Sequence, residues 1–187
     1  MNTLEAIAQR RSIRRFKDTP IPDEAIQAIL TAATQAPSGK NRQSWRFIVV
    51  RQDKRAEMIR IMCEAIAGIK SQGRDTGSSE WTTNCMSQAP VTIFVFNAYP
   101  PGNEKGERTW HVVNVQSIGA AIQNMLLAAQ ELGIGSLWIC DVFYAYDELR
   151  AWLGRTDEMI AAVSFGYPDE QPKAQPRKPV SEVTQWF

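Results

Sequence analysis

The sequence predicts one layered domain that mixes helices with four β-strands, of the α+β or α/β class. Four short runs rich in β-branched and aromatic residues have the composition of strands, at residues 45–50, 91–96, 136–140 and 160–165. Apolar residues at helical spacing lie before and between these runs. A chain of 187 residues can bury its own core without a disulfide or a metal. We therefore expect a single domain over residues 1–187.

Two helices are predicted before the first strand. The first covers residues 2–9, and its apolar face consists of Leu4, Ile7 and Ala8. The second begins after Ile21, where a proline and two acidic residues suit a first helical turn. It ends near Ala36 because the proline that follows disfavours helical geometry before it. Residues 37–44 then have the composition of a loop.

The middle of the chain alternates regular elements with polar stretches. Residues 54–70 have helical spacing, and residues 71–89 are polar and contain glycines, which favours a loop or a mobile lid. The continuous apolar run at 91–96 is typical of a strand buried on both faces. Residues 98–109 are expected to form another loop.

The helix predicted over residues 112–132 is unusual because it has no charged residue from Val112 to Gln130. Such a helix is buried nearly all round, either in a large core or across a subunit interface. A short helix is expected at 146–153, between the last two strands. The tail, residues 168–187, ends in large apolar groups, so we expect it to pack on something, such as a second subunit.

Several classes of site are excluded by what the sequence lacks. There is one histidine, His111, and the cysteines Cys63, Cys85 and Cys140 are isolated, so we expect no metal site. No G-x-S-x-G motif presents a serine nucleophile, and no glycine-rich phosphate motif follows a strand. Unpaired cysteines and the lack of a signal-peptide pattern or a long apolar run predict a cytoplasmic protein outside the membrane.

The net charge of +1 conceals a segregation of charge along the chain. Residues 1–60 carry 12 basic and 6 acidic side chains, and residues 61–172 carry 6 basic and 13 acidic ones. Residues 173–187 carry 3 basic and 1 acidic side chains. This pattern excludes a general polyanion binder and favours a local anion site. A nucleic-acid patch at 10–17 is the weaker alternative, because no aromatic residues are interleaved with the basic ones.

Three segments are candidates for a binding site. Four arginines fall within residues 10–15, and guanidinium groups beside a serine suit a phosphate, although a solvated basic surface has the same composition. The loop at 36–45 offers backbone and amide donors to a polar heterocycle, or is only a helix-to-strand connection. Arg177 lies in a second basic segment, in the proline-rich tail.

Together these segments resemble the FMN-dependent nitroreductase family. The segments RRSIRRF, TAATQAPSGKNRQSWRFIVV, AAIQNMLLAAQELGIGSLWI and PRKPVSEVTQWF resemble four blocks of that family, in the same order and across the whole chain. The resemblance implies an α+β fold with a central, mostly antiparallel sheet flanked by helices. It also implies an intertwined homodimer with the flavin at the subunit interface.

The resemblance further implies which residues bind the flavin. Arg10, Arg11, Ser12 and Arg177 would hold the phosphate and ribityl oxygens, and Arg14 would lie by the pyrimidine edge. Residues of the loop after the second helix would reach the flavin of the partner subunit: Pro37, Ser38, Gly39 and Asn41. The segment Trp138, Ile139 and Cys140 would lie along the ring. Ile139, Cys140 and Asp141 stand where the family commonly has small residues.

The activity implied by the resemblance is transfer of electrons from NAD(P)H, through FMN, to a nitroaromatic, a quinone or a similar small acceptor. No catalytic acid or base is expected, because the flavin supplies the chemistry. Cys140 is expected to be inert packing, since hydride transfer needs no thiol. The alternatives are a flavin-cleaving or dehalogenating enzyme of the same fold and a non-catalytic flavin-binding regulator. The regions 71–89 and 98–109 would then decide the substrate.

Overall fold

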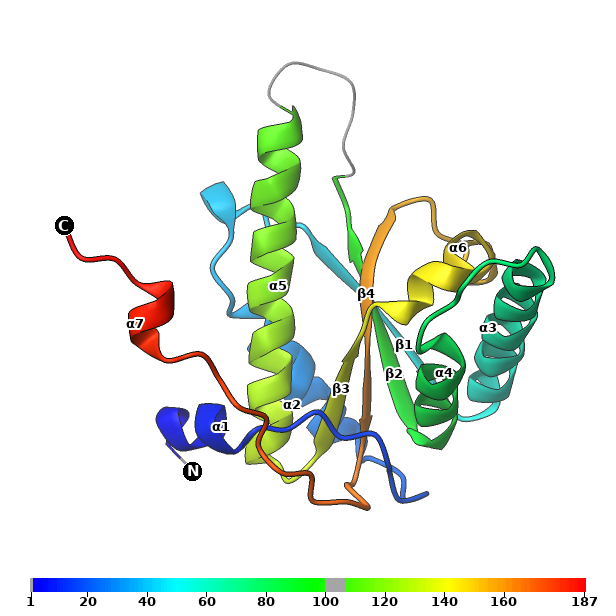
Figure 1. The fold of residues 1–187 in the computed structure, drawn as a ribbon, viewed down its shortest axis with the longest axis horizontal. Helices are drawn as coiled ribbons and strands as arrows, with labels where there is room; N and C mark the ends of the chain where they lie inside the picture. The colour runs from blue at the N-terminus through cyan, green and yellow to red at the C-terminus, as the bar shows by residue number, and fades with distance from the viewer. Residues whose placement is uncertain (1, 100–106) are drawn as a thin grey trace.

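A four-stranded antiparallel sheet forms the middle layer of the molecule (Figure 1). The structure, a computed structural model, describes residues 2–99 and 107–187. Within them the strands lie in the order β1, β2, β4, β3, and all neighbours are antiparallel. Their bounds are β1 Trp45–Arg51, β2 Val91–Asn97, β3 Gly135–Ile139 and β4 Glu158–Gly166. The four predicted strands and the α+β class are therefore confirmed.

The centre of the sheet is dry on both faces, as the sequence of the second strand predicts. Every residue of β2 is buried. Val95 pairs with Phe47 of β1 on one side and with Ala161 of β4 on the other. β3 lies at the edge of the sheet and pairs with β4 alone among the strands.

One face of the sheet is covered by α2 (Asp23–Thr34) and α5 (Glu107–Glu131), with α1 (Thr3–Gln9) at the lower end of α5 (Figure 1). α2 begins after the N-cap Pro22 and has two acidic residues in its first turn, as expected. α1 differs from its predicted packing, because its buried residue is Ala6 while Leu4 and Ile7 are exposed. α1 therefore covers little of the sheet.

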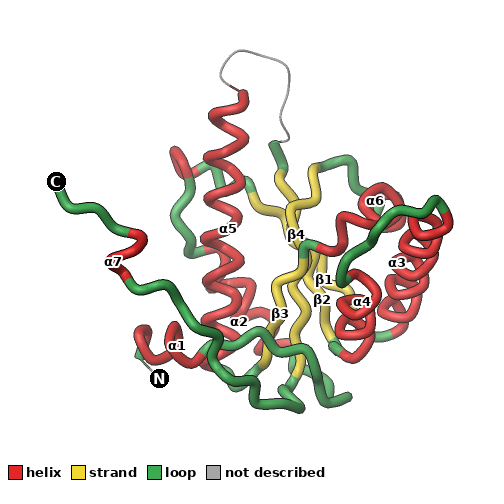
Figure 2. The backbone as a smooth tube through the Cα atoms, viewed as in Figure 1, coloured by secondary structure: helices red, strands yellow, loops and turns green. Residues whose placement is uncertain are grey.

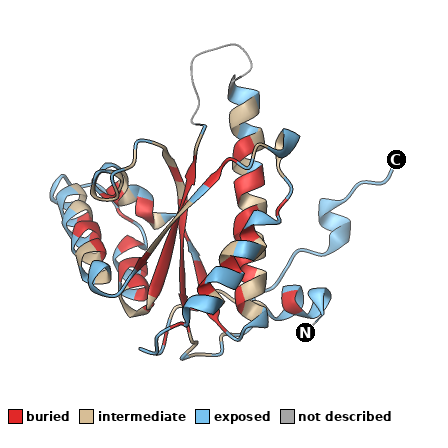
Figure 3. Cartoon of the chain, turned by 180° about the vertical axis from the view of Figure 1, so that it is seen from behind, coloured by how far each residue is buried: buried red, intermediate tan, exposed pale blue. Residues whose placement is uncertain are grey.

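α5 is buried on one side only. Its inward residues have almost no exposed surface: Ile118, Ala121, Ile122, Met125 and Ala129. The opposite side is partly exposed (Figure 3), with Val112 exposed to 47%. Its own chain therefore covers one side of this helix, and the expectation that a subunit interface covers the other side stays a prediction. Arg108–Glu131 has the length and hydropathy of a membrane span, but its packing against the sheet makes it a core helix.

The other face carries α3 (Asp53–Ser71), α4 (Ser79–Gln88), α6 (Tyr146–Trp152) and the 3₁₀ turn η2 (Asp141–Ala145). α4 lies where a loop or mobile lid is predicted, so that expectation is wrong for residues 79–88. The helix is held by burial of Thr82, Thr83, Cys85 and Met86 against the sheet side of the domain. Residues 100–106 of the second expected loop lie outside the described residues, and α5 already includes the rest from Glu107 onward.

The two ends of the chain lie on the same side of the molecule (Figure 2). After β4 the chain is extended, apart from the short helix α7 (Val180–Val183). The tail runs away from the domain, and its last apolar residues touch little of it, with Trp186 exposed to 88%. The expectation that the tail packs on a second subunit therefore stays a prediction.

Candidate functional site

The basic segment 10–15 runs along the open edge of β3. α1 ends at Gln9, and Arg10 is its C-cap. Ser12 forms a parallel bridge with Ser136, and the Ile13 N–H donates to the Ser136 carbonyl at 2.9 Å. A Cβ on Gly135 would approach the Ile13 side chain to 2.9 Å, so only glycine allows this close approach. The arginines are thereby fixed to the sheet rather than left on a free terminus.

The segment after β4 is paired with the same basic segment. Phe16 forms an antiparallel bridge with Pro168, and the Asp169 N–H donates to the Arg15 carbonyl at 2.9 Å. The Glu170 carboxylate accepts the backbone N–H groups of Arg14 at 2.5 Å and Arg15 at 3.3 Å. These contacts direct the following tail across the front of the N-terminal arginines.

The tail and the basic segment together enclose a cavity of about 380 Å³, which we call the arginine cleft. No acidic side chain among the described residues lines it, and its basic and hydroxyl-bearing lining residues are Arg10, Arg11, Ser12, Arg14, Lys173 and Arg177. The pKa of the Arg10 guanidinium is lowered, mainly by burial and then by the charges of Arg177 and Arg11. Like charges are thus held together in a partly dry place, where a dianion such as a phosphate would relieve the repulsion.

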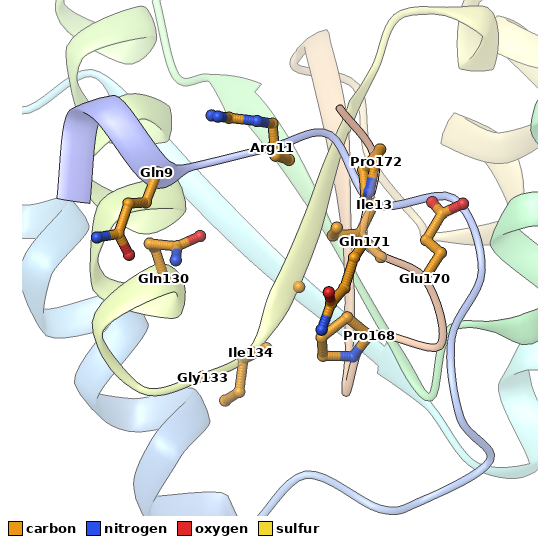
Figure 4. Close-up of a pocket in the computed structure, with 11 residues that line it drawn as sticks. Gln9, Arg11, Ile13, Gln130, Gly133, Ile134, Pro168, Glu170, Gln171 and Pro172 are labelled. Carbon is orange, nitrogen blue, oxygen red and sulfur yellow. The ribbon is translucent and has the colours of Figure 1, made fainter. Parts of the chain in front are cut away.

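Two further hollows flank the basic segment. One, of about 420 Å³, lies between the segment, the end of α5 and the tail, and its polar lining includes Gln9, Gln130 and Gln171 (Figure 4). Arg11 lines both this hollow and the arginine cleft, and its Nη1 donates to the Ala8 carbonyl at 2.7 Å.

The other hollow, of about 430 Å³, is reached past Arg14 and α4. The Arg14 guanidinium lies 5.2 Å from the centre of the Trp81 ring. An aromatic ring at this distance attracts the cation and restrains its side chain. Trp81 belongs to α4, where the sequence predicts a loop. The contact between Trp81 and Arg14 was therefore not predicted.

The predicted segment at the end of β3 lies on the same edge as the basic segment. Trp138 is exposed to 40% and faces α5 near Gly119, while Ile139 is buried in the core on the opposite face. The pKa of the Cys140 thiol is raised, mainly by burial and then by the charge of Asp141. Cys140 is an exposed residue that follows β3, so the expectation that it is packing at the end of a buried strand is wrong. Its raised pKa nevertheless keeps the thiol neutral, which agrees with the expectation that it is not a nucleophile.

The loop at residues 37–41 lies far from the arginine cleft within one chain. It contains the 3₁₀ turn η1 (Gly39–Asn41), and the Gly39 N–H donates to the Ser117 Oγ at 3.3 Å. A Cβ on Gly39 would overlap the Cγ1 of Val113, so the loop needs glycine to lie on α5. Gln130 borders the hollow beside the basic segment. A helix rises about 1.5 Å per residue, so the two ends of the predicted site are about 20 Å apart along α5.

The structure therefore divides the predicted residues into two groups. One group is brought together at the lower end of the molecule: Arg10, Arg11, Ser12, Arg14 and Arg177, with the β3 segment Trp138, Ile139 and Cys140 on the same sheet edge. The second group, Pro37, Ser38, Gly39 and Asn41, lies apart from it. Sequence reasoning missed Lys173 and Trp81. Lys173 belongs to the basic tail segment, and that basic composition is the sequence feature from which its place in the cleft could have been predicted.

The Nitroreductase family model matches residues 7–167 of the chain. A protein of Archaeoglobus fulgidus named "Putative NADH dehydrogenase/NAD(P)H nitroreductase" is 37% identical over 174 residues, covering 90% of this chain and 86% of that protein. The iodotyrosine deiodinase of Thermotoga neapolitana is 28% identical over 182 residues, covering 92% and 91% of the two chains. The crystal structure of a "putative nitroreductase in complex with fmn" from Desulfovibrio desulfuricans is 31% identical, with a TM-score of 0.78 over 100% of this chain and 98% of that chain.

Proposed function

This chain belongs to the nitroreductase family of flavin oxidoreductases, and from that membership we propose that it transfers electrons from NAD(P)H to an electron-poor acceptor such as a nitroaromatic or a quinone. The observation that carries the proposal is the arginine cleft. A partly buried cluster of cations lined by no carboxylate is a site for a small, doubly charged anion. FMN has such a group, and FMN is bound in the Desulfovibrio relative.

We assign the phosphate of FMN to Arg10, Arg11, Ser12 and Arg177, with Lys173 as a further cation. Guanidinium groups offer paired donors that match phosphate oxygens, and the serine hydroxyl adds another donor. Trp138, Ile139 and Cys140 are assigned to the side of the ring, because they lie on the sheet edge along which the basic segment runs.

Bound FMN would supply the redox chemistry, taking a hydride from NAD(P)H and passing electrons to the acceptor. The role of the protein is to bind FMN, to orient it and to polarise its ring. Arg14, restrained by Trp81, would place a fixed positive charge beside the part of the ring that becomes negative on reduction. No protein acid or base is assigned, and the raised pKa of Cys140 supports leaving this thiol out of the chemistry.

We propose that the working unit is a homodimer. Pro37, Ser38, Gly39 and Asn41 are too far from the arginine cleft of their own chain to share one flavin with it. They would instead complete the site of the partner subunit. The partly exposed side of α5 and the apolar residues at the end of the tail supply surface for such a contact. We treat residues 1–187 as one domain whose tail packs on the partner, working in the reducing cytoplasm, where its free cysteines stay unpaired.

A second candidate reaction is reductive dehalogenation by the same flavin site, because an iodotyrosine deiodinase is similar over nearly the whole chain. The two reactions differ in acceptor and share the cofactor. Loading the purified protein with FMN and measuring NAD(P)H oxidation with nitroaromatic, quinone and halotyrosine acceptors separates them.

The same experiment tests the proposal as a whole. We expect a yellow protein with flavin absorbance and acceptor-dependent oxidation of NAD(P)H. A protein that stays colourless after incubation with FMN would refute the proposed function. A protein that binds FMN but oxidises no NAD(P)H with any of these acceptors would be a flavin-binding regulator.

A further inference from the structure

A group of cations and aromatic rings lies beside residues 37–41, and we call it the basic–aromatic cluster: Lys40, Arg42, Tyr99 and Trp110. The Lys40 Nζ is 5.2 Å from the centre of the Trp110 ring. The Arg42 Cζ is 4.5 Å from the centre of the Tyr99 ring and 4.9 Å from that of Trp110. Arg42 is therefore held against two rings that come from separate parts of the chain.

Neither cation is neutralised within the described residues, where no ion pair includes Lys40 or Arg42. The carboxylate at the start of β4, Glu158, has other partners: it accepts from the Asn97 Nδ2 at 3.1 Å and lies 3.4 Å from the His111 Nδ1. The same Asn97 amide donates to the Tyr99 carbonyl at 2.9 Å. Glu158 thus helps to hold the Tyr99 backbone, and the positive charges remain available to a ligand.

The loop that carries the two cations has an unfavourable backbone. Lys40 has φ 50°, Asn41 has φ 53° and Gln43 has φ 47°, in the left-handed region that favours glycine. The loop is kept there by internal contacts, such as the donation from the Gln43 N–H to the Ser38 Oγ at 3.1 Å. Backbone strain of this kind persists where the surroundings fix it, and it is concentrated at ligand-binding loops.

We infer that Lys40 and Arg42 form a specificity element that binds the anionic group of a substrate entering the flavin site of the partner subunit. This inference rests on the proposed function, which brings Ser38 and Gly39 of the same loop to that site. A cation held on an aromatic face keeps its charge and loses little freedom on binding an anion. The recognised chemistry is a phosphate or a carboxylate, which has two sources: the phosphates of NAD(P)H or an acid group on the acceptor.

The test is the double variant Lys40→Gln/Arg42→Gln in the FMN-loaded protein. Calorimetric titration with NADP⁺ measures dinucleotide binding without turnover. Reoxidation of the reduced protein by 4-nitrobenzoate and by its neutral analogue 4-nitrobenzamide measures recognition of an acid group. We expect a loss of about tenfold or more for NADP⁺ or for 4-nitrobenzoate, which decreases as salt is added. Reoxidation by 4-nitrobenzamide should be unchanged.

The matched control is Lys54→Gln/Arg60→Gln, which removes two exposed cations from α3 on the opposite side of the sheet. It should leave every measurement at the parent value. Loss with NADP⁺ identifies the dinucleotide as the source of the anion, and loss with 4-nitrobenzoate alone identifies the acceptor. Parent values for both ligands in the cluster variant would overturn the inference while FMN binding and NAD(P)H oxidation stand. Failure of the proposed function is distinct, because the parent would then bind no FMN.

Discussion

Arg177 stands at the meeting point of the two ends of the chain, and its charge lowers the pKa of Arg10. We predict that Arg177→Ala weakens FMN binding by about tenfold or more, because a charge-assisted bond to the phosphate is lost. The melting temperature of the flavin-free protein should not fall, because a repulsive charge is removed. Titration of FMN fluorescence and thermal denaturation measure the two effects. Lys178→Ala is the neighbouring control, and equal FMN affinity of Arg177→Ala and parent would contradict the assignment.

Gly39 and Gly68 provide a pair of substitutions with opposite expected signs. A Cβ on Gly39 would overlap Val113 of α5, so Gly39→Ala should destabilise the protein by about 1–3 kcal/mol. Gly68 lies inside α3 with no atom within 4 Å of a Cβ, so Gly68→Ala should stabilise it by about 0.5–1 kcal/mol. Urea unfolding of both variants measures the difference. Equal effects would show that the contact between the loop and α5 is looser than described.

The Cys140 thiol should react slowly with iodoacetamide at neutral pH, because its raised pKa keeps it protonated. Its reaction should accelerate as the pH rises through that pKa. Asp141→Asn removes the second cause of the shift, so the acceleration should begin at a lower pH in this variant. Mass spectrometry of the alkylated peptide measures the rate. An identical pH profile in parent and variant would remove Asp141 as a cause.

Much of the candidate site can be predicted at this scale, since the arginines of residues 10–14 and Arg177 do line one cleft. Composition could not predict that Trp81 restrains Arg14, because the contact joins residues far apart in the sequence. The flavin contacts themselves stay predictions. Trp110 and Tyr99 were missed for a similar reason, since only the folded chain brings them to Arg42.

At the scale of elements, α4 depends on tertiary contacts more than on its own sequence. Serine, threonine and asparagine are weak helix formers, which is why residues 79–88 read as a loop. Ser79, Thr82, Thr83 and Met86 nevertheless fall at helical spacing and are buried. That spacing is the sequence pattern from which α4 could have been predicted. The hydroxyls of Ser78 and Thr82 also donate to the Asp141 carboxylate, which ties the helix to η2.

We predict that Thr82→Val destabilises α4 by about 1 kcal/mol, because valine keeps the shape of threonine and loses the donor to Asp141. Backbone hydrogen exchange over residues 79–88 should become faster, while exchange in β2 should change little. Ser87→Ala is the control on the same helix, since its hydroxyl bonds only to the carbonyl of Asn84. Unchanged exchange in Thr82→Val would show that apolar packing alone holds the helix.

The four strands were predictable because their runs of β-branched and aromatic residues are short, continuous and bounded by turns. The second of them is buried on both faces, as its sequence indicates. α5 was predicted as an element, but its surroundings were not. The lack of charged residues predicts that a helix is buried. It does not show whether the burying residues come from the same chain or from another one, and here the same chain buries only one side of α5.

At the scale of the whole molecule, the apolar end of the tail is exposed within one chain. We predict a homodimer that is weakened by Trp186→Ser/Phe187→Ser, because these two side chains are among the most exposed apolar groups in the described residues. Sedimentation equilibrium should show a higher dimer dissociation constant, and FMN affinity should fall with it. Gln185→Ser is the control in the same tail. A parent protein that is monomeric and binds FMN fully would contradict the shared site.

The arginine cleft has a practical consequence for anyone handling this protein. In the proposed function its arginines bind the charged phosphate of FMN, and inorganic phosphate and sulfate are anions of the same kind. Simple buffer anions should therefore compete for the same arginines and lower the apparent affinity for flavin. Selectivity for FMN over these anions must come from the groups that contact the flavin ring. If those groups include residues 37–41 of a second subunit, the tightness of binding comes from one chain and its selectivity from the other.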